Sequence, residues 1–306
     1  MNLHQFRFVR EAVRQNFNLT EAAKALYTSQ PGVSKAIIEL EEELSIDIFT
    51  RHGKRIRGLT KPGQAILRSV EIIMQEIEGL KKIGKEFSMH DTGNLTIATT
   101  HTQARYALPK IVKEFTIQFP KVKLSLLQGN PKQIAEMIQN DQADIAIATE
   151  ILPPNDKLIS IPCYQWGYII IVPLDHPLLL LNSISLKEIS NYPLITYDSA
   201  FSGRIKLDRE FFLQKLTPHI ILETINADII KTYVELRIGI GIIASIAFDS
   251  NRDKNIRSIS ANHLFGTTVS RVIIKQGTYL PGYVYSFIKL LSPTLNRKLI
   301  NKIIDN

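Results

Sequence analysis

The sequence predicts three structural parts in order: a small helical domain that ends in a basic β-hairpin, one long helix, and a larger two-lobed α/β domain. Three observations support this fold class. Apolar residues recur at helical spacing through the first sixty residues. A heptad repeat of apolar residues follows from residue 66. Strand-like and helix-like segments then alternate from residue 95 onward. A chain of 306 residues is also too long for one small core.

The composition is that of an ordinary globular protein, with 44% hydrophobic and 22% charged residues. The net charge of +8 favours a polyanionic partner. Cys163 is the single cysteine, which excludes an internal disulfide and agrees with a reducing compartment. The N-terminus carries Arg7 and Arg10 without an apolar core behind them, and no apolar run reaches the length of a membrane span. We therefore expect a cytoplasmic protein that does not bind membranes.

The first sixty residues predict three short helices. The first has one apolar face, formed by Leu3, Phe6, Val9 and Val13. The second begins at Thr20, a good N-cap residue, and its paired alanines allow a neighbouring helix to approach closely. The third begins after Ser29, because serine suits the N-cap position and Pro31 suits a first turn, where a missing N–H costs nothing. Its buried stripe consists of Val33, Ile37, Leu40 and Leu44.

The opposite face of the third helix is unusual, because a solvated face normally carries long charged side chains. This face carries mostly short polar groups, and its residues are Gln30, Pro31, Ser34, Lys35 and Ile38. Such a face suits entry into the major groove of DNA, where Gln30 and Ser34 reach base edges and Lys35 reaches a phosphate or guanine. Thr28 and Ser29 precede these residues in the turn and join the candidate DNA-binding set. A plain three-helix bundle with a polar cap remains the alternative.

A short basic hairpin is predicted next, around the turn His52-Gly53-Lys54. Its cations are Arg51, Lys54, Arg55 and Arg57, and acidic residues gather just before it in the third helix. A basic hairpin beside a helix that reads DNA contacts phosphates, which adds affinity without sequence information. We expect Arg51, Lys54 and Arg55 to make these contacts. The alternative is a solvated loop with no partner.

The long helix carries a heptad seam of Ile66, Val70, Ile73, Ile77 and Leu80. Such a seam buries either against its own domain or against a second copy of the chain. The position of this helix between two domains favours the second copy. A dimer would present two DNA-reading helices to the two half-sites of a palindromic operator.

The remainder predicts two α/β lobes with a cleft between them, which is a ligand-binding architecture. The first lobe has expected strands at 95–99, 122–128 and 144–148, with helices at 104–118 and 132–140. The second lobe has expected strands at 168–172, 194–197, 220–224 and 240–244, with helices at 205–216 and 227–237. Segments 270–275 and 282–291 are expected to return to the first lobe.

Polar residues cluster where three of these strands end. The clusters are Thr100, Thr102 and Gln103, then Thr149, then Ser199, Ser202 and Gly203. Ligands of open α/β sheets lie at the carboxyl ends of strands, and helix N-termini attract anions. Any one of these clusters could be explained by polar residues that cap the start of the next helix. Three clusters at corresponding strand ends favour a pocket in which hydroxyl and N–H groups bind a small anion without a buried cation.

Catalytic and metal-binding patterns are missing from the sequence. No His-x-x-x-His pair, no metal spacing around Cys163 and no Gly-x-Ser-x-Gly elbow occurs. The strand ends carry hydroxyls and an amide, with no positioned base or nucleophile. We therefore expect no enzyme activity, no metal and no cofactor.

The segment "EAAKALYTSQPGVSKAIIELEEELSIDIFTR" (21–51) resembles the LysR-type transcriptional regulators, and the resemblance extends over the whole chain. Ser45 stands where a glycine is usual in that family. The resemblance implies a winged helix-turn-helix DNA-binding domain in 1–60 and a linker or dimerisation helix in 61–90. It implies a periplasmic-binding-protein-like effector domain in 91–306, with lobe I at about 91–163 and 269–306 and lobe II at about 164–268.

Within that family the chain is similar to regulators of cysteine biosynthesis and sulfur assimilation, through segments such as "IATTHTQARYALP" and "NADIIKTYVELRIGIGIIAS". The resemblance implies a small anionic effector such as acetylserine, sulfate or a related sulfur metabolite. The implied effector-binding residues are Thr100, Thr102, Gln103, Thr149 and Ser202, with Trp166 and Arg204 as neighbours. It also implies operator DNA and RNA polymerase as partners, assembly as a homotetramer, and activation of transcription. A LysR-type regulator of another small-anion pathway and a solute-binding protein remain the alternatives.

Overall fold

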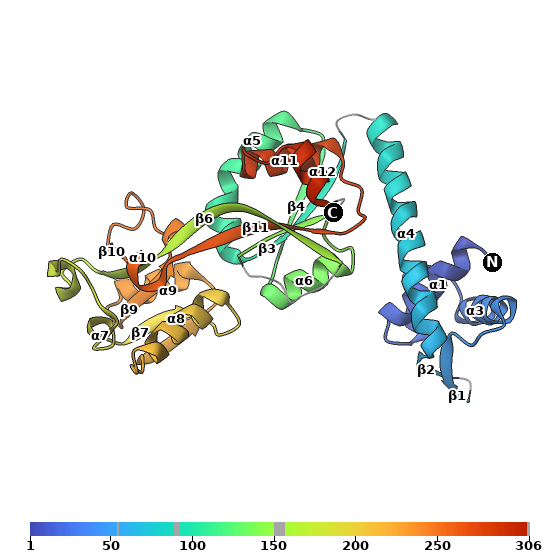
Figure 1. Ribbon diagram of the computed structural model, residues 1–306, viewed down its shortest axis with the longest axis horizontal. Helices are drawn as coiled ribbons and strands as arrows, with labels where there is room; N and C mark the ends of the chain where they lie inside the picture. The colour runs from blue at the N-terminus through green and yellow to red at the C-terminus, as the bar shows by residue number, and fades with distance from the viewer. Residues whose placement is uncertain (54, 89–91, 150–156, 305–306) are drawn as a thin grey trace. The chain divides into compact units, whose positions relative to one another are not determined.

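The computed structural model describes residues 1–53, 55–88, 92–149 and 157–304, and the chain divides into two compact units (Figure 1). The first unit comprises Met1–Gly84 together with Gly277–Tyr279. The second comprises Lys85–Gln276 and Leu280–Asn306.

The first unit holds a three-helix bundle, an antiparallel β-hairpin and the long helix (Figure 1). Its elements are α1 (Leu3–Arg14), α2 (Leu19–Ala25), α3 (Gln30–Leu44), β1 (Phe49–His52), β2 (Arg55–Leu59) and α4 (Lys61–Ser88). The predicted cap of α3 is confirmed, since the Ser29 hydroxyl accepts from the Gly32 N–H at 3.3 Å. The predicted cap of α2 is wrong, because the Asn18 side chain accepts from Thr20 N–H at 3.1 Å. Thr20 therefore lies inside the helix, because an asparagine two residues earlier serves as the cap.

The long helix α4 contributes to the core of its own unit. Val70 and Met74 are buried there, and Ile66, Ile73 and Ile77 pack against the same core. Among the α4 side chains that the structure describes, Ile72 and Leu80 are the large apolar ones that are exposed. Most of the heptad seam is therefore already used inside the unit, and Leu80 is the seam residue that stays accessible. Gly63 permits the close packing of this helix, because a Cβ there would lie 1.9 Å from the Ile48 carbonyl oxygen.

The second unit is built on a nine-stranded sheet across its described residues, in the order β4-β3-β5-β11-β6-β9-β7-β8, with β10 paired to β6. The strands are β3 (Gly93–Thr99), β4 (Val122–Gln128), β5 (Ile145–Ala148), β6 (Leu158–Pro173), β7 (Leu194–Tyr197), β8 (Ile220–Thr224), β9 (Ile240–Ala244), β10 (Ile256–Ser260) and β11 (Thr267–Lys275). The helical elements are η1 (Gln103–Ala107), α5 (Leu108–Gln118), α6 (Pro131–Gln139), η2 (Pro177–Leu180), α7 (Leu186–Ile189), α8 (Ser202–Leu213), α9 (Ala227–Glu235), η3 (Ser245–Ala247), α10 (Asn262–Phe265), α11 (Gly282–Leu291) and α12 (Arg297–Ile304).

Two long antiparallel strands, β6 and β11, pass between the two lobes (Figure 1). Lobe I contains β3, β4 and β5 with helices α5, α6 and α11, and lobe II contains β7, β8 and β9 with helices α8 and α9. The predicted return of 270–275 to lobe I agrees with the pairing of β11 with β5. Each lobe has buried apolar clusters of its own. The strands β6 and β11, called the hinge strands below, therefore connect two separate cores.

The turn after β3 is an unusual helix. Residues Gln103–Ala107 form the π-helix η1, which continues directly into α5. π-Helical turns are rare and occur frequently at functional sites.

No helix of the described residues is long and apolar enough to cross a membrane. Those same residues contain no group of His, Cys, Asp and Glu side chains that could hold a metal ion.

Candidate DNA-binding face and effector cavity

The start of α3 presents an accessible polar face. Val33 and Ile37 are buried on one side of the helix, whereas Gln30 and Lys35 are exposed on the other and Ser34 is half-buried. Neither the Gln30 amide nor the Ser34 hydroxyl has a side-chain hydrogen bond within the described chain. These polar groups are therefore available to an external partner, as the sequence predicts.

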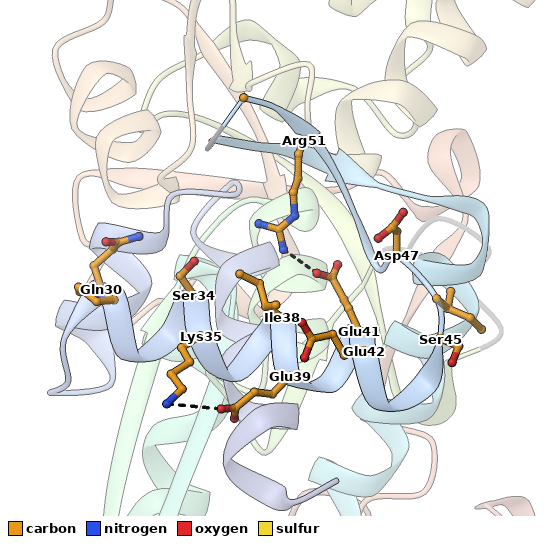
Figure 2. Close-up of a pocket in the computed structure, with 13 residues that line it drawn as sticks. Gln30, Ser34, Lys35, Ile38, Glu39, Glu41, Glu42, Ser45, Asp47 and Arg51 are labelled. Carbon is orange, nitrogen blue, oxygen red and sulfur yellow. Dashed lines mark hydrogen bonds and ion pairs between the residues drawn. The ribbon is translucent and has the colours of Figure 1, made fainter.

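This face borders a broad groove of about 1090 Å³. Figure 2 shows Lys35 turned toward Glu39, and the two side chains form a 3.7 Å ion pair in which Lys35 is 79% exposed. An exposed pair of this kind contributes little stability, so Lys35 can exchange it for a phosphate at small cost. Glu42 and Asp47 line the other end of the groove. Their negative charge disfavours a polyanion beside them, so the end formed by Gln30 and Ser34 suits one better.

Arg51 lies beside this groove but has a structural partner. Figure 2 shows its side chain reaching from the hairpin to Glu41, with a 2.6 Å hydrogen bond. The buried Glu41 carboxylate also accepts from the backbone N–H groups of Ile48 at 2.8 Å and Phe49 at 3.0 Å. Glu41 thus ties the C-terminal half of α3 to the hairpin. The sequence prediction assigned Arg51 only to phosphates and missed this pair, whose partners are ten residues apart.

The second strand of the hairpin presents two arginines that form no ion pair or hydrogen bond with a described residue. Arg55 and Arg57 are exposed on either side of the buried Ile56, so both point to one face of β2. They line a polar groove of about 450 Å³ together with Asn18 and Gln30. Arg57 has the same placement as the predicted Arg55, and the strand alternation around Ile56 is the signal that identifies it. Lys54 lies outside the described residues.

In the second unit, three strand-end clusters surround a small cavity of about 30 Å³. Its lining residues are Thr100, Thr102, Gln103, Thr149, Trp166, Tyr197, Phe201, Gly203 and Ala244. A single buried water needs roughly 10–15 Å³ on the same measure. The lobes are thus arranged around a space for a very small group.

Gln103 organises one wall of this cavity. Its side chain is 1% exposed, and its Nε2 donates to Ser270 Oγ at 3.0 Å and to Thr149 Oγ1 at 3.3 Å. The Tyr164 hydroxyl donates to the side-chain Oε1 of Gln103, and Trp166 Nε1 donates to Ser270 Oγ at 3.0 Å. The wall consists of neutral donors and acceptors that are already oriented by one another. No carboxylate and no cation lines the cavity among the described residues.

The structure brings together five of the seven predicted effector residues: Thr100, Thr102, Gln103, Thr149 and Trp166. Ser202 begins α8 between Phe201 and Gly203, both of which line the cavity. Arg204 does not line the cavity, because its guanidinium pairs with Asp208 and Glu223. A cation saturated by two carboxylates has little capacity left for an anionic ligand.

Two aromatic lining residues, Tyr197 and Phe201, were not predicted from the sequence, whereas Trp166 was. Tyr197 ends β7, at the same sheet edge as Thr149, and strand-end logic alone could have identified it. Burial raises the pKa of the Tyr197 phenol to about 12, despite hydrogen bonds from Ala244 and with Thr102 that favour ionisation. Tyr197 is therefore a neutral group at physiological pH, which preserves the uncharged character of the cavity.

The same chain segment links the two lobes. Three residues after Gln103, the Tyr106 hydroxyl donates to Asp228 Oδ1 on α9 at 2.6 Å. Arg105 and Lys231 lie 3.5 and 3.4 Å from the Asp228 carboxylate. Burial alone would raise the pKa of Asp228, but the Tyr106 hydrogen bond and the two cations outweigh it and lower that pKa. Burial, followed by the contact with Asp228, raises the pKa of Tyr106 far above its usual range.

Comparison with known protein families identifies the domains that carry these two candidate sites. Residues 3–64 match the family of bacterial regulatory helix-turn-helix proteins of the lysR type, and residues 89–295 match the LysR substrate binding domain. The chain belongs to the LysR family. The predicted winged helix-turn-helix followed by a two-lobed, periplasmic-binding-protein-like effector domain is therefore confirmed.

Individual relatives place the chain among the CysB-like members of the LysR family. It is 63% identical over 302 residues to the transcriptional regulator CysB of Burkholderia cenocepacia, covering 99% of this chain and 96% of that protein. It is 49% identical to the regulator SsuR of the same organism, covering 97% and 96%. The crystal structure of the cofactor-binding domain of the Cbl regulator superposes with a TM-score of 0.66 and 38% identity, covering 70% of this chain and 93% of that one. The chain is accordingly a LysR-type transcriptional regulator.

Proposed function

We propose that this LysR-type regulator controls genes of cysteine biosynthesis or sulfur assimilation by binding double-stranded operator DNA. The observation that carries the DNA proposal is the polar, accessible start of α3, where the Gln30 and Ser34 side chains have no hydrogen-bond partner in the described chain. Thr28, Ser29, Pro31 and Lys35 adjoin them, and Arg55 supplies a cation from the hairpin. The similarity to CysB and SsuR supports the choice of target genes.

The cavity between the lobes is the proposed effector site. Hydroxyl and amide groups stabilise a small oxyanion by directed hydrogen bonds, without the desolvation cost of a buried cation. Thr100, Thr102 and Thr149 supply hydroxyls to this space of about 30 Å³. A sulfate-sized anion suits the closed arrangement, whereas acetylserine requires the lobes to separate further. Sulfate, acetylserine and related sulfur metabolites are the proposed effectors.

Assembly and transcription activation are further parts of the proposal. The exposed Ile72 and Leu80 on α4 are apolar side chains that a second copy can cover. Pairing would place two α3 helices on two half-sites, and two such dimers would form a homotetramer. We propose that the assembled regulator acts in the cytoplasm as an activator that contacts RNA polymerase, with no catalytic role.

The DNA proposal is tested by operator binding at two salt concentrations with Lys35→Ala and Arg55→Ala. Each substitution removes one phosphate-facing cation, so affinity should fall and the salt dependence should flatten by about one charge. Lys81→Ala is the matched control, because Lys81 is also exposed and ion-paired on a helix, to Glu78, but lies outside the α3 groove. Equal affinity for all three variants and the parent protein would refute the proposed interface.

The effector proposal is tested with Thr100→Val, which removes a hydroxyl from the cavity and keeps its shape. Operator binding should be unchanged, while the response to sulfate and acetylserine should be lost. Thermal shift with sulfate, thiosulfate, acetylserine and adenylyl sulfate would identify the effector. A full response in Thr100→Val would move the effector site elsewhere, and stabilisation only by anions unrelated to sulfur would assign the regulator to a different pathway.

A further inference from the structure

The hydrogen bonds around the effector cavity make its lining rich in donors and poor in acceptors. Three of the groups that set this pattern, Ser270, Tyr164 and Trp166, lie on the hinge strands. The buried Ser270 hydroxyl accepts from Trp166 Nε1, which can only donate, and from Gln103 Nε2, each at 3.0 Å. Burial raises the pKa of Tyr164 to about 12, although a hydrogen bond from Ser270 acts in the opposite direction. Ser270 therefore gives its own proton to Tyr164.

Tyr164 in turn engages the side-chain acceptor of Gln103. The Tyr164 phenol keeps its proton at physiological pH and already accepts from Ser270, so its proton goes to Gln103 Oε1. The other end of the amide, Gln103 Nε2, donates to Ser270 and Thr149. Both ends of the amide are thus oriented by neighbours, and its oxygen is occupied. Tyr164 does not line the cavity itself, so it acts on the cavity through Gln103.

Two buried hydroxyls of the lining have a proton without an acceptor in the described chain. Thr100 Oγ1 accepts from the Gln103 backbone N–H at 3.4 Å and donates to no described residue. The Tyr197 oxygen accepts from the Ala244 N–H at 3.3 Å and from the Thr102 hydroxyl. The Tyr197 proton has no acceptor among the described residues either. A buried donor that stays unsatisfied is costly, so both protons favour an acceptor that a ligand supplies.

Backbone groups of the lining reinforce this pattern. The carbonyl oxygens of Thr100 and Phe201 accept from the N–H groups of Ala104 and Arg204, each at 3.0 Å. Gly203 lies in the first turn of α8, where N–H groups have no intrahelical acceptor. No carboxylate lines the cavity in the part of the chain that the structure describes. The cavity therefore presents protons to a ligand and has little capacity to accept a proton from it.

We propose that the effector cavity selects its ligand by protonation state, and that Tyr164 is the positioning residue that sets this selection. The inference rests on the proposed effector function of the cavity. A fully ionised oxyanion, such as sulfate or thiosulfate, offers only acceptors and satisfies the Thr100 and Tyr197 protons. The hydrogen phosphate dianion has the charge of sulfate and nearly its size and shape, but its P–OH group needs an acceptor. In the cavity this proton meets another donor, so hydrogen phosphate is rejected.

The test is isothermal titration of the full-length protein with sulfate, hydrogen phosphate and fluorophosphate at mildly alkaline pH. Fluorophosphate is then a dianion with a P–F bond in place of the P–OH bond, so the two phosphates differ by one proton donor at equal charge. Sulfate and fluorophosphate should bind at least roughly tenfold more tightly than hydrogen phosphate, because they bring no unsatisfied donor into the cavity. Equal affinities for fluorophosphate and hydrogen phosphate would overturn the inference.

Tyr164→Phe tests the positioning role. The change releases Gln103 Oε1 as an acceptor, so the affinity for hydrogen phosphate relative to sulfate should rise at least roughly fivefold. Tyr285→Phe is the matched control, because it removes a phenol that donates to Asn301 Oδ1 at 2.6 Å outside the cavity, and it should leave the ratio unchanged. A loosened fold weakens the binding of both anions together, so an unchanged ratio in Tyr164→Phe contradicts the role of Tyr164.

Thr100→Val separates this inference from the effector proposal. Loss of sulfate binding in Thr100→Val supports the cavity as the place where the anion binds. If sulfate binds Thr100→Val as tightly as the parent protein, or if the parent protein binds neither sulfate nor fluorophosphate, the cavity is not an oxyanion site and the selection falls with it. If sulfate binding depends on Thr100 but hydrogen phosphate binds equally well, the effector cavity stands and the selection alone is refuted.

Discussion

Glu41 offers a sharp test of how the helix α3 and the hairpin are held together. Its buried carboxylate accepts from two backbone N–H groups, those of Ile48 and Phe49, and from the Arg51 guanidinium. In Glu41→Gln, the amide oxygen can still accept from the backbone, but an NH2 group faces Arg51 in place of the second carboxylate oxygen. In Glu41→Ala, the two backbone donors and the guanidinium all lose their acceptor.

The structure sets the size of the two effects. A hydrogen bond to a charged group contributes about 1.5–3 kcal/mol, so Glu41→Gln should destabilise the N-terminal domain by roughly 2 kcal/mol. Each buried backbone N–H left without an acceptor costs about 1–3 kcal/mol, so Glu41→Ala should cost roughly 4 kcal/mol or more. Glu42→Gln is the matched control, because it removes the same charge from the neighbouring residue, whose side chain is exposed.

Hydrogen exchange measured by mass spectrometry gives the local readout, and operator binding gives the functional one. The segment around Ile48 and Phe49 should lose protection in both Glu41 variants and keep it in Glu42→Gln. Operator affinity should fall when the hairpin is released from α3, whereas Glu42→Gln removes a negative charge from the groove and should leave affinity equal or higher. If Glu41→Gln and Glu42→Gln behave alike in exchange and in affinity, the assigned role of Glu41 is wrong.

Two further substitutions test the packing of α4 and the contact between the lobes. Gly63→Ala should destabilise the N-terminal domain by about 1–3 kcal/mol in urea unfolding, because its Cβ would lie 1.9 Å from the Ile48 carbonyl oxygen. Gly84→Ala meets no atom within 4 Å and should be neutral or stabilising by up to about 1 kcal/mol, so equal effects would contradict the close contact. The lowered pKa of Asp228 stabilises the folded state above the unfolded-state pKa of about 4, and this contribution is lost as pH falls through the lower folded-state value. Tyr106→Phe removes one cause of that shift, so its urea midpoint should depend less on pH between 7 and 3 than that of the parent protein; an unchanged pH dependence would exclude the interlobe bond as a cause.

The elements that the sequence predicts well are those with local signals. The 4-3-4 stripe of α3 depends on helical periodicity alone, and the clusters at Thr100 and Thr149 follow from strand ends, so both could be placed without tertiary information. The full length of β6 could not, because Pro162 and Gly167 interrupt its strand pattern. Proline and glycine are unfavourable inside a strand, but the pairing of β6 with β11 over most of its length outweighs this preference.

Other features depend on contacts between distant residues. The seam on α4 has the same spacing whether it packs on its own domain or on a second copy. Only the fold shows that Val70 is buried in the core of its own domain, whereas Leu80 is exposed. In the same way, the carboxylates that saturate Arg204 lie four and nineteen residues away, and no sequence pattern distinguishes a paired arginine from one that awaits a ligand.

The π-helical turn η1 gives a physical route from the effector cavity to the lobe contact. Gln103 lines the cavity and Tyr106 bonds Asp228 of the opposite lobe, and one short helical turn holds both. A ligand that displaces the Gln103 side chain from Ser270 and Thr149 therefore acts on the same turn that carries Tyr106. The coupling must be reciprocal, because a contact that favours closed lobes also favours any ligand that binds the closed state better. A hydrogen bond to a charged group, such as that of Tyr106 to the Asp228 carboxylate, contributes about 1.5–3 kcal/mol, which limits its share of that coupling to about 150-fold in effector affinity. Any larger response must therefore recruit other interlobe contacts, such as that between His101 and Asn226.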